Sequence, residues 1–221
     1  CMGLPVGRLI CASNKNNVLT DFLTTGTYDR NRDFFKTISP SMDILISSNL
    51  ERLLYHMAED KAKVASWMQQ LQQEGRYDIG SELLEKIQQT FWADWTSDED
   101  TEACIADVYE KDHYVADPHT AVAWSVAEKY QQATGDAHHM VVVSTASPYK
   151  FNGSVLDALG VKTAGVDEFT LLDELQAKNS DPIPEGLASL RCKEVRHDGV
   201  CAPATMEKAV MLFASADSVQ E

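Results

Sequence analysis

The stretch HHMVVVSTASPYKF, residues 138–151, restricts the architecture more than any other part of the sequence. Residues 140–145 form a short, valine-rich run of the kind that builds a buried strand. The run ends on Ser144 and Thr145, and Pro148 follows where a turn begins. Either these hydroxyls only close a strand, or they face a ligand that lies beyond its carboxyl end.

Helical periodicity surrounds this strand. Asp117 and Pro118 predict a helix start, because an aspartate caps free N–H groups and a proline in the first turn has no N–H to leave unpaired. That helix continues to Gly135, and a first strand is expected at residues 6–11. Further helices are expected over residues 17–25, 48–75, 81–92, from 97 onward, 154–159, 168–178 and 203–213.

Short apolar strands separated by helices predict an α/β fold whose parallel strands are flanked by helices. Ser48 and Glu51 have the spacing of a capping box at the start of a helix.

Composition and charge limit the possible functions. The chain has 34 acidic and 19 basic residues, and its net charge of -15 repels nucleic-acid backbones and anionic membranes, so neither is expected as a partner. No apolar stretch approaches the roughly 20 residues of a membrane helix. The five cysteines are scattered without a CxxC pair, which predicts reduced, mostly buried thiols, a cytoplasmic protein and no metal site.

Polar segments follow the expected strands or open the expected helices, where ligands bind in open α/β sheets. The largest group of such side chains consists of Ser39, Ser41, Ser47, Ser48, Asn49 and Arg52. The group suits a phosphate or carboxylate, although the same residue types also cap helices and form turns. His119 is either a helix-start residue with a satisfied ring or a catalyst. The sequence contains no nucleophile–base triad, glycine-rich phosphate loop or nucleotide fingerprint.

Four motifs occur in order along the chain: ICASNKNNVLTDF, SPSMDILISSNLERLL, DPHTAVA and STASPYKF. Together they resemble the C-terminal half of threonine synthases of the bacterial and fungal type. The resemblance covers residues 1–57 and 113–165 and is weak between them. It implies a division of the chain into residues 1–57, which end a first α/β region, a variable helical insertion at 58–112, and a returning α/β region at 113–221.

This resemblance implies a pyridoxal-phosphate (PLP) enzyme of the tryptophan-synthase-β type, fold type II, which converts O-phospho-L-homoserine and water to L-threonine and phosphate. It implies that a hydroxyl, from Thr145 or Ser144, meets the ring nitrogen of the cofactor. Asn14 and Asn17 are then expected to line the cofactor pocket. The residues expected to hold the phosphate or carboxylate of the substrate are Arg52, Asn49, Ser48 and Ser41.

The Schiff-base lysine and the glycine-rich phosphate loop of this family lie in an N-terminal half, and Lys15 and Lys150 do not match the lysine motif. The chain is therefore expected to be a C-terminal fragment that has no catalytic residue of its own and is inactive without the N-terminal half. Two alternatives remain open. One is a related PLP-dependent phospholyase for another phosphorylated amino alcohol, and the other is a non-catalytic domain that uses the scaffold for binding or oligomerisation.

Overall fold

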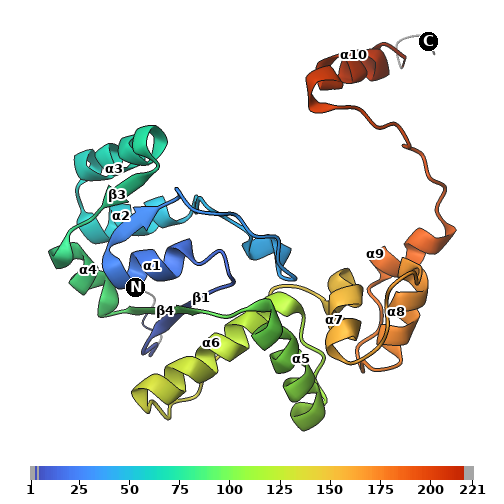
Figure 1. Cartoon of the computed structure of the whole chain (residues 1–221), viewed down its shortest axis with the longest axis horizontal. Helices are drawn as coiled ribbons and strands as arrows, with labels where there is room; N and C mark the ends of the chain where they lie inside the picture. Colours follow the sequence, from blue (N-terminus) through green and yellow to red (C-terminus); the bar gives the residue numbers. More distant parts are fainter. Residues whose placement is uncertain (1–2, 4, 217–221) are drawn as a thin grey trace. The chain divides into compact units, whose positions relative to one another are not determined.

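A computed structural model describes residues 3 and 5–216 of the 221-residue chain. The chain forms two compact units that divide after Ile183, and each is described by itself. The first unit contains, in order, β1 (Leu9–Ser13), α1 (Val18–Thr25), β2 (Thr27–Asp29), η1 (Pro40–Met42), α2 (Leu50–Ala58), α3 (Lys61–Glu74), β3 (Arg76–Asp78), α4 (Ser81–Gln88), β4 (Phe91–Trp95), α5 (Asp98–Asp112), α6 (Pro118–Thr134), η2 (Pro148–Phe151), α7 (Asn152–Ala158) and α8 (Glu168–Gln176) (Figure 1). The second unit contains α9 (Glu185–Ala188), η3 (Ser189–Cys192), η4 (Pro203–Thr205) and α10 (Met206–Ala216).

The central element of the first unit is the parallel strand pair β1–β4. Its register runs from Leu9 opposite Phe91 to Ser13 opposite Trp95. Helices α1 and α6 both pack on the two strands, α1 on one face and α6 on the other (Figure 1). The predicted α/β class with parallel strands flanked by helices is therefore confirmed. The first strand was predicted at residues 6–11 and lies at Leu9–Ser13.

Strand β4 occupies a region for which the sequence predicted a helix. The helix predicted over residues 81–92 ends earlier, as α4, and Phe91 and Trp92 lie in the strand. Ile87 and Phe91 are four residues apart and imitate a helical face, but aromatic residues favour the pleated, half-buried surface beside β1. The segment 58–112 is thus not purely helical, because it supplies both β3 and β4.

A second strand pair, β2 and β3, runs antiparallel and was absent from the sequence predictions. Tyr28 lies opposite Tyr77, with the two rings stacked at 5.4 Å between centroids. Phe22 packs on both rings, and Trp67 packs on Tyr77. Each strand has only three residues, too few for a periodic pattern, so aromatic burial holds this pair together. The buried core around it consists of Val18, Phe22, Leu23, Tyr28, Leu50, Leu54, Val64, Trp67, Leu71, Tyr77, Ile79 and Ile87.

The single helix predicted over residues 48–75 is two helices. The capping box predicted at Ser48 is wrong, since Asn49 directly precedes α2 and its side chain makes no capping hydrogen bond. Glu59 adopts a left-handed conformation with φ of 55°, which ends α2. Asp60 then caps α3 by accepting two backbone N–H groups of the first turn. The apolar stripe hid this break because both helices bury residues in the same core.

The two helix starts predicted after β4 are confirmed. Ser97 caps α5 by accepting the N–H of Asp100, and Asp117 caps α6 by accepting the N–H of His119. Gly135 ends α6 with a φ of 70°, which glycine adopts without strain. Because α6 packs on α5 as well as on the strands, its first turn is held from two sides.

Residues 140–145 do not form the strand that the sequence predicted. Val141 and Val143 are 85% and 69% exposed. A strand needs a neighbour for its backbone N–H and C=O groups, and no strand pairs with this segment within residues 3 and 5–216. The valine-rich composition therefore indicates a propensity to form a strand, but among the described residues the segment has no neighbouring strand to pair with.

The later helix predictions are confirmed with shifted bounds. The segment predicted at 154–159 contains most of α7, and α8 lies within 168–178. The segment predicted at 203–213 is η4 followed by α10. In the part of the chain that the structure describes, no helix is long and apolar enough to cross a bilayer.

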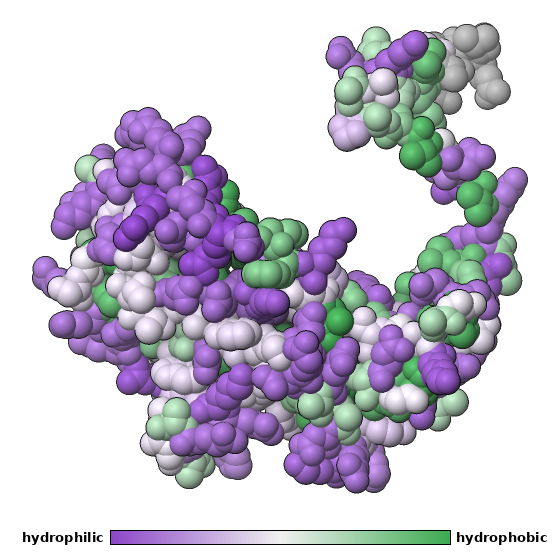
Figure 2. Space-filling view, viewed as in Figure 1, coloured by the Kyte–Doolittle hydropathy of each residue, from purple (hydrophilic) through white to green (hydrophobic). Residues whose placement is uncertain are grey.

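The second unit buries little of its apolar surface. Several apolar side chains of α10 are more than half exposed, and Figure 2 shows apolar surface over this helix. These side chains are Met206, Val210, Met211, Leu212 and Phe213. Within residues 184–215 no residue is buried, so this part of the unit has no hydrophobic core of its own.

The thiols of Cys11, Cys104, Cys192 and Cys201 are free, as predicted, while Cys1 lies outside the described residues. The prediction that they are mostly buried is wrong. Cys11 and Cys104 are half-buried, and Cys192 and Cys201 are exposed because they belong to the part of the second unit that has no core. Burial raises the pKa of the Cys11 thiol to about 11, so this thiol is protonated at neutral pH.

We predict that Leu54→Ala lowers the free energy of unfolding by about 2–5 kcal/mol, because Leu54 is fully buried in the core of the first unit. Leu190→Ala is the matched control. It makes the same chemical change at a side chain that is 48% exposed, and we expect a loss below about 0.5 kcal/mol. Urea unfolding of the 221-residue chain measures both values. Equal losses would show that the core around Leu54 is not packed as described.

Candidate functional site

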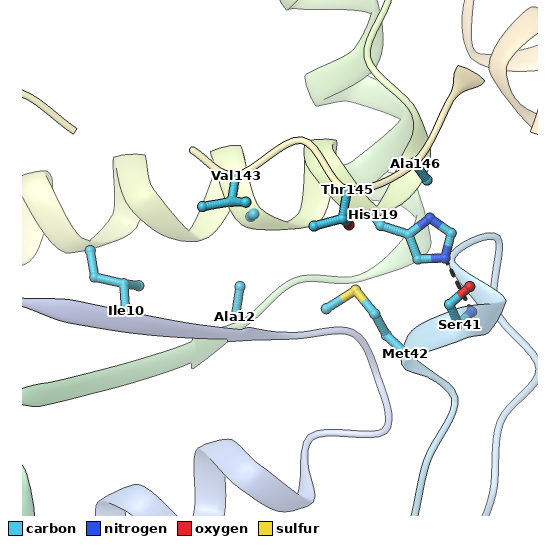
Figure 3. Close-up of a pocket in the computed structure, with 9 residues that line it drawn as sticks. Ile10, Ala12, Ser41, Met42, His119, Val143, Thr145 and Ala146 are labelled. Atoms are coloured by element: carbon cyan, nitrogen blue, oxygen red, sulfur yellow. Dashed lines mark hydrogen bonds between the residues drawn. The ribbon is translucent and has the colours of Figure 1, made fainter. Parts of the chain in front are cut away.

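A cavity of about 410 Å³ lies beside β1 (Figure 3). Its walls come from β1, η1, the first turns of α6 and residues 143–146. The lining residues are Ile10, Ala12, Ser41, Met42, His119, Ala123, Val143, Thr145 and Ala146. Segments far apart in the sequence thus form one concave surface, which is the usual form of a small-molecule site.

Apolar side chains of β1 and α6 line much of this cavity. Ile10 and Ala12 are two residues apart on a strand, so they point to the same face, which α6 covers. Ala123 contributes to the wall from α6. The small side chains at positions 12 and 123 leave the space between strand and helix that larger residues would fill.

His119, in the first turn of α6, provides a polar part of the wall (Figure 3). Its Nδ1 is 2.8 Å from a carboxylate oxygen of Asp117, and its Nε2 accepts the backbone N–H of Ser41 at 3.1 Å. A ring nitrogen that accepts carries no proton, so Nδ1 carries the proton and donates to Asp117. The Phe151 ring packs on the imidazole at 4.6 Å between centroids. This geometry favours the interpretation of His119 as a helix-start residue with a satisfied ring.

Asp117 fixes this arrangement from inside the protein. Its side chain has no exposed surface, and its carboxylate accepts the N–H of His119 at 2.9 Å, the His119 ring and the hydroxyl of Thr120. Burial acts to raise the pKa of the Asp117 carboxyl, but the hydrogen bonds from His119 and Thr120 outweigh it and hold the pKa below its ordinary value. The N-terminus of α6 also favours a negative charge there. Asp117 is therefore ionised at neutral pH.

The two hydroxyls predicted to meet a cofactor lie in different surroundings. Thr145 lines the cavity. Ser144 lies instead 3.1 Å from the hydroxyl oxygens of both Tyr114 and Thr120, outside the cavity lining. Neighbouring residues of an extended chain point to opposite sides, which explains the difference. Of this pair, Thr145 is the one placed to contact a ligand in the cavity.

The predicted cofactor residues Asn14 and Asn17 are not part of the cavity wall. Asn14 is 1% exposed, and its amide donates to Asp43 and to the Thr37 hydroxyl, both at 2.8 Å. The Asn17 side chain accepts a hydrogen bond from Arg32 at 3.1 Å. Asn14 thus stabilises the chain that follows β1, and cofactor contact by either asparagine stays a prediction.

Asp43 fixes the position of η1, which it directly follows. Its carboxylate accepts hydrogen bonds from the side chains of Asn14, Asn16 and Thr37 at 2.7–2.9 Å. It also accepts the backbone N–H of Thr37 at 3.1 Å. These bonds tie the end of η1 to the end of β1, and they place the preceding residues Ser41 and Met42 in the cavity wall.

The predicted substrate residues are divided between two places. Ser41 lies in the cavity wall, whereas Arg52, Asn49 and Ser48 are exposed at the start of α2 and do not line the cavity. The guanidinium of Arg52 donates to the side chain of Asn49, so these two residues are in contact. Anion binding by this group stays a prediction.

The cavity wall contains no lysine. Lys15 lies over the ring of Phe35, with its Nζ 4.3 Å from the ring centroid, and Lys150 is exposed. Among the described residues, no group of three or more His, Cys, Asp or Glu side chains is arranged to hold a metal ion.

Sequence reasoning identified three polar residues of this cavity: Ser41 and Thr145 as ligand contacts, and His119 with two roles open. It did not single out Ile10, Ala12, Met42, Ala123, Val143 or Ala146. All of these except Val143 lie within the four quoted motifs, and Val143 directly precedes the last one. The motifs therefore located the cavity. The apolar lining residues were not predicted as ligand contacts because an apolar side chain carries no group that indicates a particular chemistry.

Comparisons with known proteins agree with the motif pattern. Residues 120–210 match the family model described as threonine synthase, C-terminal. Threonine synthase-like 1 of Mus musculus is 43% identical over 195 residues, which cover 87% of this chain and 26% of that protein. The crystal structure of threonine synthase from yeast aligns with a TM-score of 0.72 at 33% identity, over 87% of this chain and 39% of that one. PLP-bound threonine synthase from Brucella melitensis aligns with a TM-score of 0.67 at 39% identity, over 78% and 37% of the two chains.

The α/β architecture and these structural neighbours define the class: the chain has the fold of the C-terminal part of PLP-dependent threonine synthases. The chain itself is a relative of the threonine synthases, as its four motifs predicted. It spans about a quarter of the length of the curated proteins named threonine synthase-like 1 that it matches.

We predict that Asp117→Ala lowers the free energy of unfolding at pH 7 by at least about 3 kcal/mol. The substitution leaves three buried donor groups without their acceptor, and each such group costs about 1–3 kcal/mol. Thr120→Val is a milder comparison, because it removes one of these donors and leaves the carboxylate in place. Urea unfolding compares the two variants. Similar small losses in both would show that the carboxylate does not hold this region together.

The pH dependence of Asp117→Asn follows from the lowered pKa of Asp117. The extra stability that the wild-type carboxylate provides is fully present above its unfolded pKa of about 3.9, and it is lost as the pH falls through the lower pKa of the folded state. The stability difference between wild type and Asp117→Asn should therefore shrink below about pH 4. A difference that stays constant between pH 7 and pH 3 in urea unfolding would contradict the assignment.

Proposed function

We propose that the full-length protein containing this chain is a PLP-dependent threonine synthase, which converts O-phospho-L-homoserine and water to L-threonine and phosphate. One observation carries the proposal: all four motifs that resemble threonine synthases contribute to a single cavity. The first motif supplies Ile10 and Ala12, the second Ser41 and Met42, the third His119 and Ala123, and the fourth Thr145 and Ala146. In this proposal the chain is a C-terminal fragment that is inactive without the N-terminal half of the same enzyme.

The cavity wall fits one side of a PLP ring. Its apolar surface suits the flat face of an aromatic ring, and the hydroxyl of Thr145 is the kind of group that exchanges a hydrogen bond with a ring nitrogen. When bound, PLP supplies an electron sink for reactions at the carbon atoms of an amino acid. Because the lining has no lysine or arginine, the Schiff-base lysine and the donors to the cofactor phosphate belong, in this proposal, to the N-terminal half.

The residues of this chain then have separate tasks. Thr145 would hold the ring nitrogen with a hydroxyl, which would not keep that nitrogen protonated as a carboxylate does, and this would suit elimination and replacement chemistry. Ile10 and Val143 would supply apolar contacts to the ring. Ser144 supports Thr145 from outside the cavity through its hydroxyl contacts with Tyr114 and Thr120.

The substrate side of the proposal rests on Ser41 in the cavity wall and on the exposed group at the start of α2. Arg52, with its fork of donors, would hold the phosphate or carboxylate of the substrate, assisted by Asn49 and Ser48. Asn14 and Asn17 remain proposed contacts on the cofactor side.

The cellular setting and the internal divisions are also proposals. The net charge of -15 and the free thiols support a cytoplasmic protein without nucleic-acid or membrane partners. The divisions at 1–57, 58–112 and 113–221 are retained, with β4 joining the middle segment to the first one.

A related PLP-dependent phospholyase, acting on another phosphorylated amino alcohol, is the second candidate. The observation that favours it is the identity pattern: the relative at 43% identity is named threonine synthase-like 1, whereas the yeast protein named threonine synthase is 36% identical. The same cavity would serve both reactions, since the two substrates share an amino acid and a phosphate.

The test of the proposed function uses the protein expressed from the complete coding sequence, with the 221-residue chain as a comparison. We expect the complete protein to release phosphate from O-phospho-L-homoserine and to form an equal amount of threonine, and the chain alone to release none. Phosphate release only from another phosphorylated amino alcohol would favour the phospholyase. No release from either substrate, together with the absence of an upstream lysine and glycine-rich loop, would favour a non-catalytic domain. Release by the chain alone would contradict the fragment proposal.

A second prediction concerns Thr145. In the complete protein, Thr145→Asp places a carboxylate against the ring nitrogen, and a nearby negative charge favours the protonated form of that nitrogen. We expect transamination products to increase relative to threonine and the visible absorbance of the cofactor to change. Thr145→Ser retains a hydroxyl and should stay close to wild type, and Ser144→Asp should leave the absorbance unchanged because Ser144 faces Tyr114 and Thr120. An unchanged spectrum and product ratio in a folded Thr145→Asp variant would show that this hydroxyl does not meet the cofactor.

A further inference from the structure

The first turn of α6 contacts two walls of the cavity at once. The His119 ring accepts the backbone N–H of Ser41, which belongs to the η1 wall. The hydroxyl of Thr120 lies 3.1 Å from that of Ser144, the neighbour of the cavity residue Thr145. Both side chains donate to the carboxylate of Asp117, so a single buried anion orients the contacts to both walls.

The η1 wall is held by two separate groups. Asp43 ties the end of η1 to β1 through the hydrogen bonds described above. The middle of η1 is tied to α6 by His119, across 78 residues of sequence. A 3₁₀ turn of three residues has few hydrogen bonds of its own, so its position depends on these external contacts.

The contact with Ser41 requires one particular form of the imidazole. The backbone N–H of Ser41 can only donate, and Nε2 must therefore present a lone pair. The Asp117 carboxylate can only accept, and Nδ1 must therefore carry the proton. The packing of Phe151 on the ring limits its rotation. The ring is thus held in one tautomer and one orientation, with 7% of His119 exposed.

We propose that His119 is a positioning residue for this site: oriented by Asp117, its imidazole accepts the N–H of Ser41 and fixes the Pro40–Met42 turn as a wall of the cavity. The proposal rests on the proposed function, since it assigns to this wall the task of holding the substrate in the reaction that the complete protein carries out. His119 acts through Ser41 and Met42 and is not itself required to exchange a proton with the substrate.

Two amide substitutions separate the two ends of the ring. His119→Gln places an amide oxygen near the position of Nε2, where it can still accept from Ser41. His119→Asn places its amide near the position of Nδ1, where it can still donate to Asp117 but cannot reach Ser41. If the contact with Ser41 fixes the turn, the glutamine variant keeps the turn in place and the asparagine variant does not. If His119 only serves as a partner for Asp117, the order is reversed.

The first measurement is amide hydrogen exchange by NMR on the 221-residue chain, which needs neither cofactor nor activity. We expect the Ser41 amide to exchange roughly tenfold faster in His119→Asn than in wild type and to keep most of its protection in His119→Gln, as for loss and retention of one hydrogen bond. The amide of Ala121, which donates to the carbonyl oxygen of Asp117 at 2.9 Å, is the internal control. Equal exchange of Ser41 in wild type and His119→Asn would overturn the proposal, and so would parallel loss of protection at Ala121, since the helix start itself would then have failed.

The second measurement is the steady-state kinetics of the complete protein with O-phospho-L-homoserine. We expect His119→Asn to raise KM by roughly fivefold to tenfold with kcat within about twofold of wild type, and His119→Gln to restore KM. Unchanged KM in His119→Asn, with faster exchange at Ser41, would overturn the role of this wall in holding the substrate. If the wild-type complete protein releases no phosphate, the proposed function fails, while the exchange rate of Ser41 still decides whether His119 positions the turn.

Discussion

The parallel pairing of β1 with β4 is the constraint on which the rest of the first unit depends. A tight turn cannot join parallel strands, so the chain must leave the end of β1 and return to the start of β4 through residues 14–90. This excursion places α1 on one face of the pair and carries η1 to the cavity, and the chain after β4 brings α6 to the other face. The cavity lies beside Ile10 and Ala12 of β1, where η1 and the start of α6 come together.

Apolar packing brings these elements together, but it is not directional, and hydrogen bonds to two carboxylates supply the orientation. Asp43 accepts from groups on both sides of the loop after β1, and Asp117 accepts from two consecutive residues of α6. The turn that carries Ser41 is held between these two carboxylates, one acting directly and the other through His119. The polar side chains of the cavity are thus positioned by two carboxylates that lie outside the cavity lining.

Features that depend on local chemistry were predictable from the sequence. The cap at Asp117, the proline beside it and the helix end at Gly135 are where local rules place them. The break at Glu59 and the strand at Phe91 were missed because an apolar stripe does not distinguish one helix from two, or a helix from a strand that finds a partner. In the site, resemblance indicated Thr145 and Ser41, but the bond from Ser41 to His119 joins residues 78 positions apart, which no local pattern predicts.

The distribution of the cavity wall along the chain has a consequence for the gene. The shortest contiguous piece that contains every lining residue runs from Ile10 to Ala146, so a premature stop codon within that span removes at least the last lining residue, Ala146. All of the lining residues belong to the first unit, which ends at Ile183. Frameshifts and length variation beyond that residue leave the cavity-forming sequence intact, and natural variants are therefore expected to tolerate changes after Ile183 more readily than changes between positions 10 and 146.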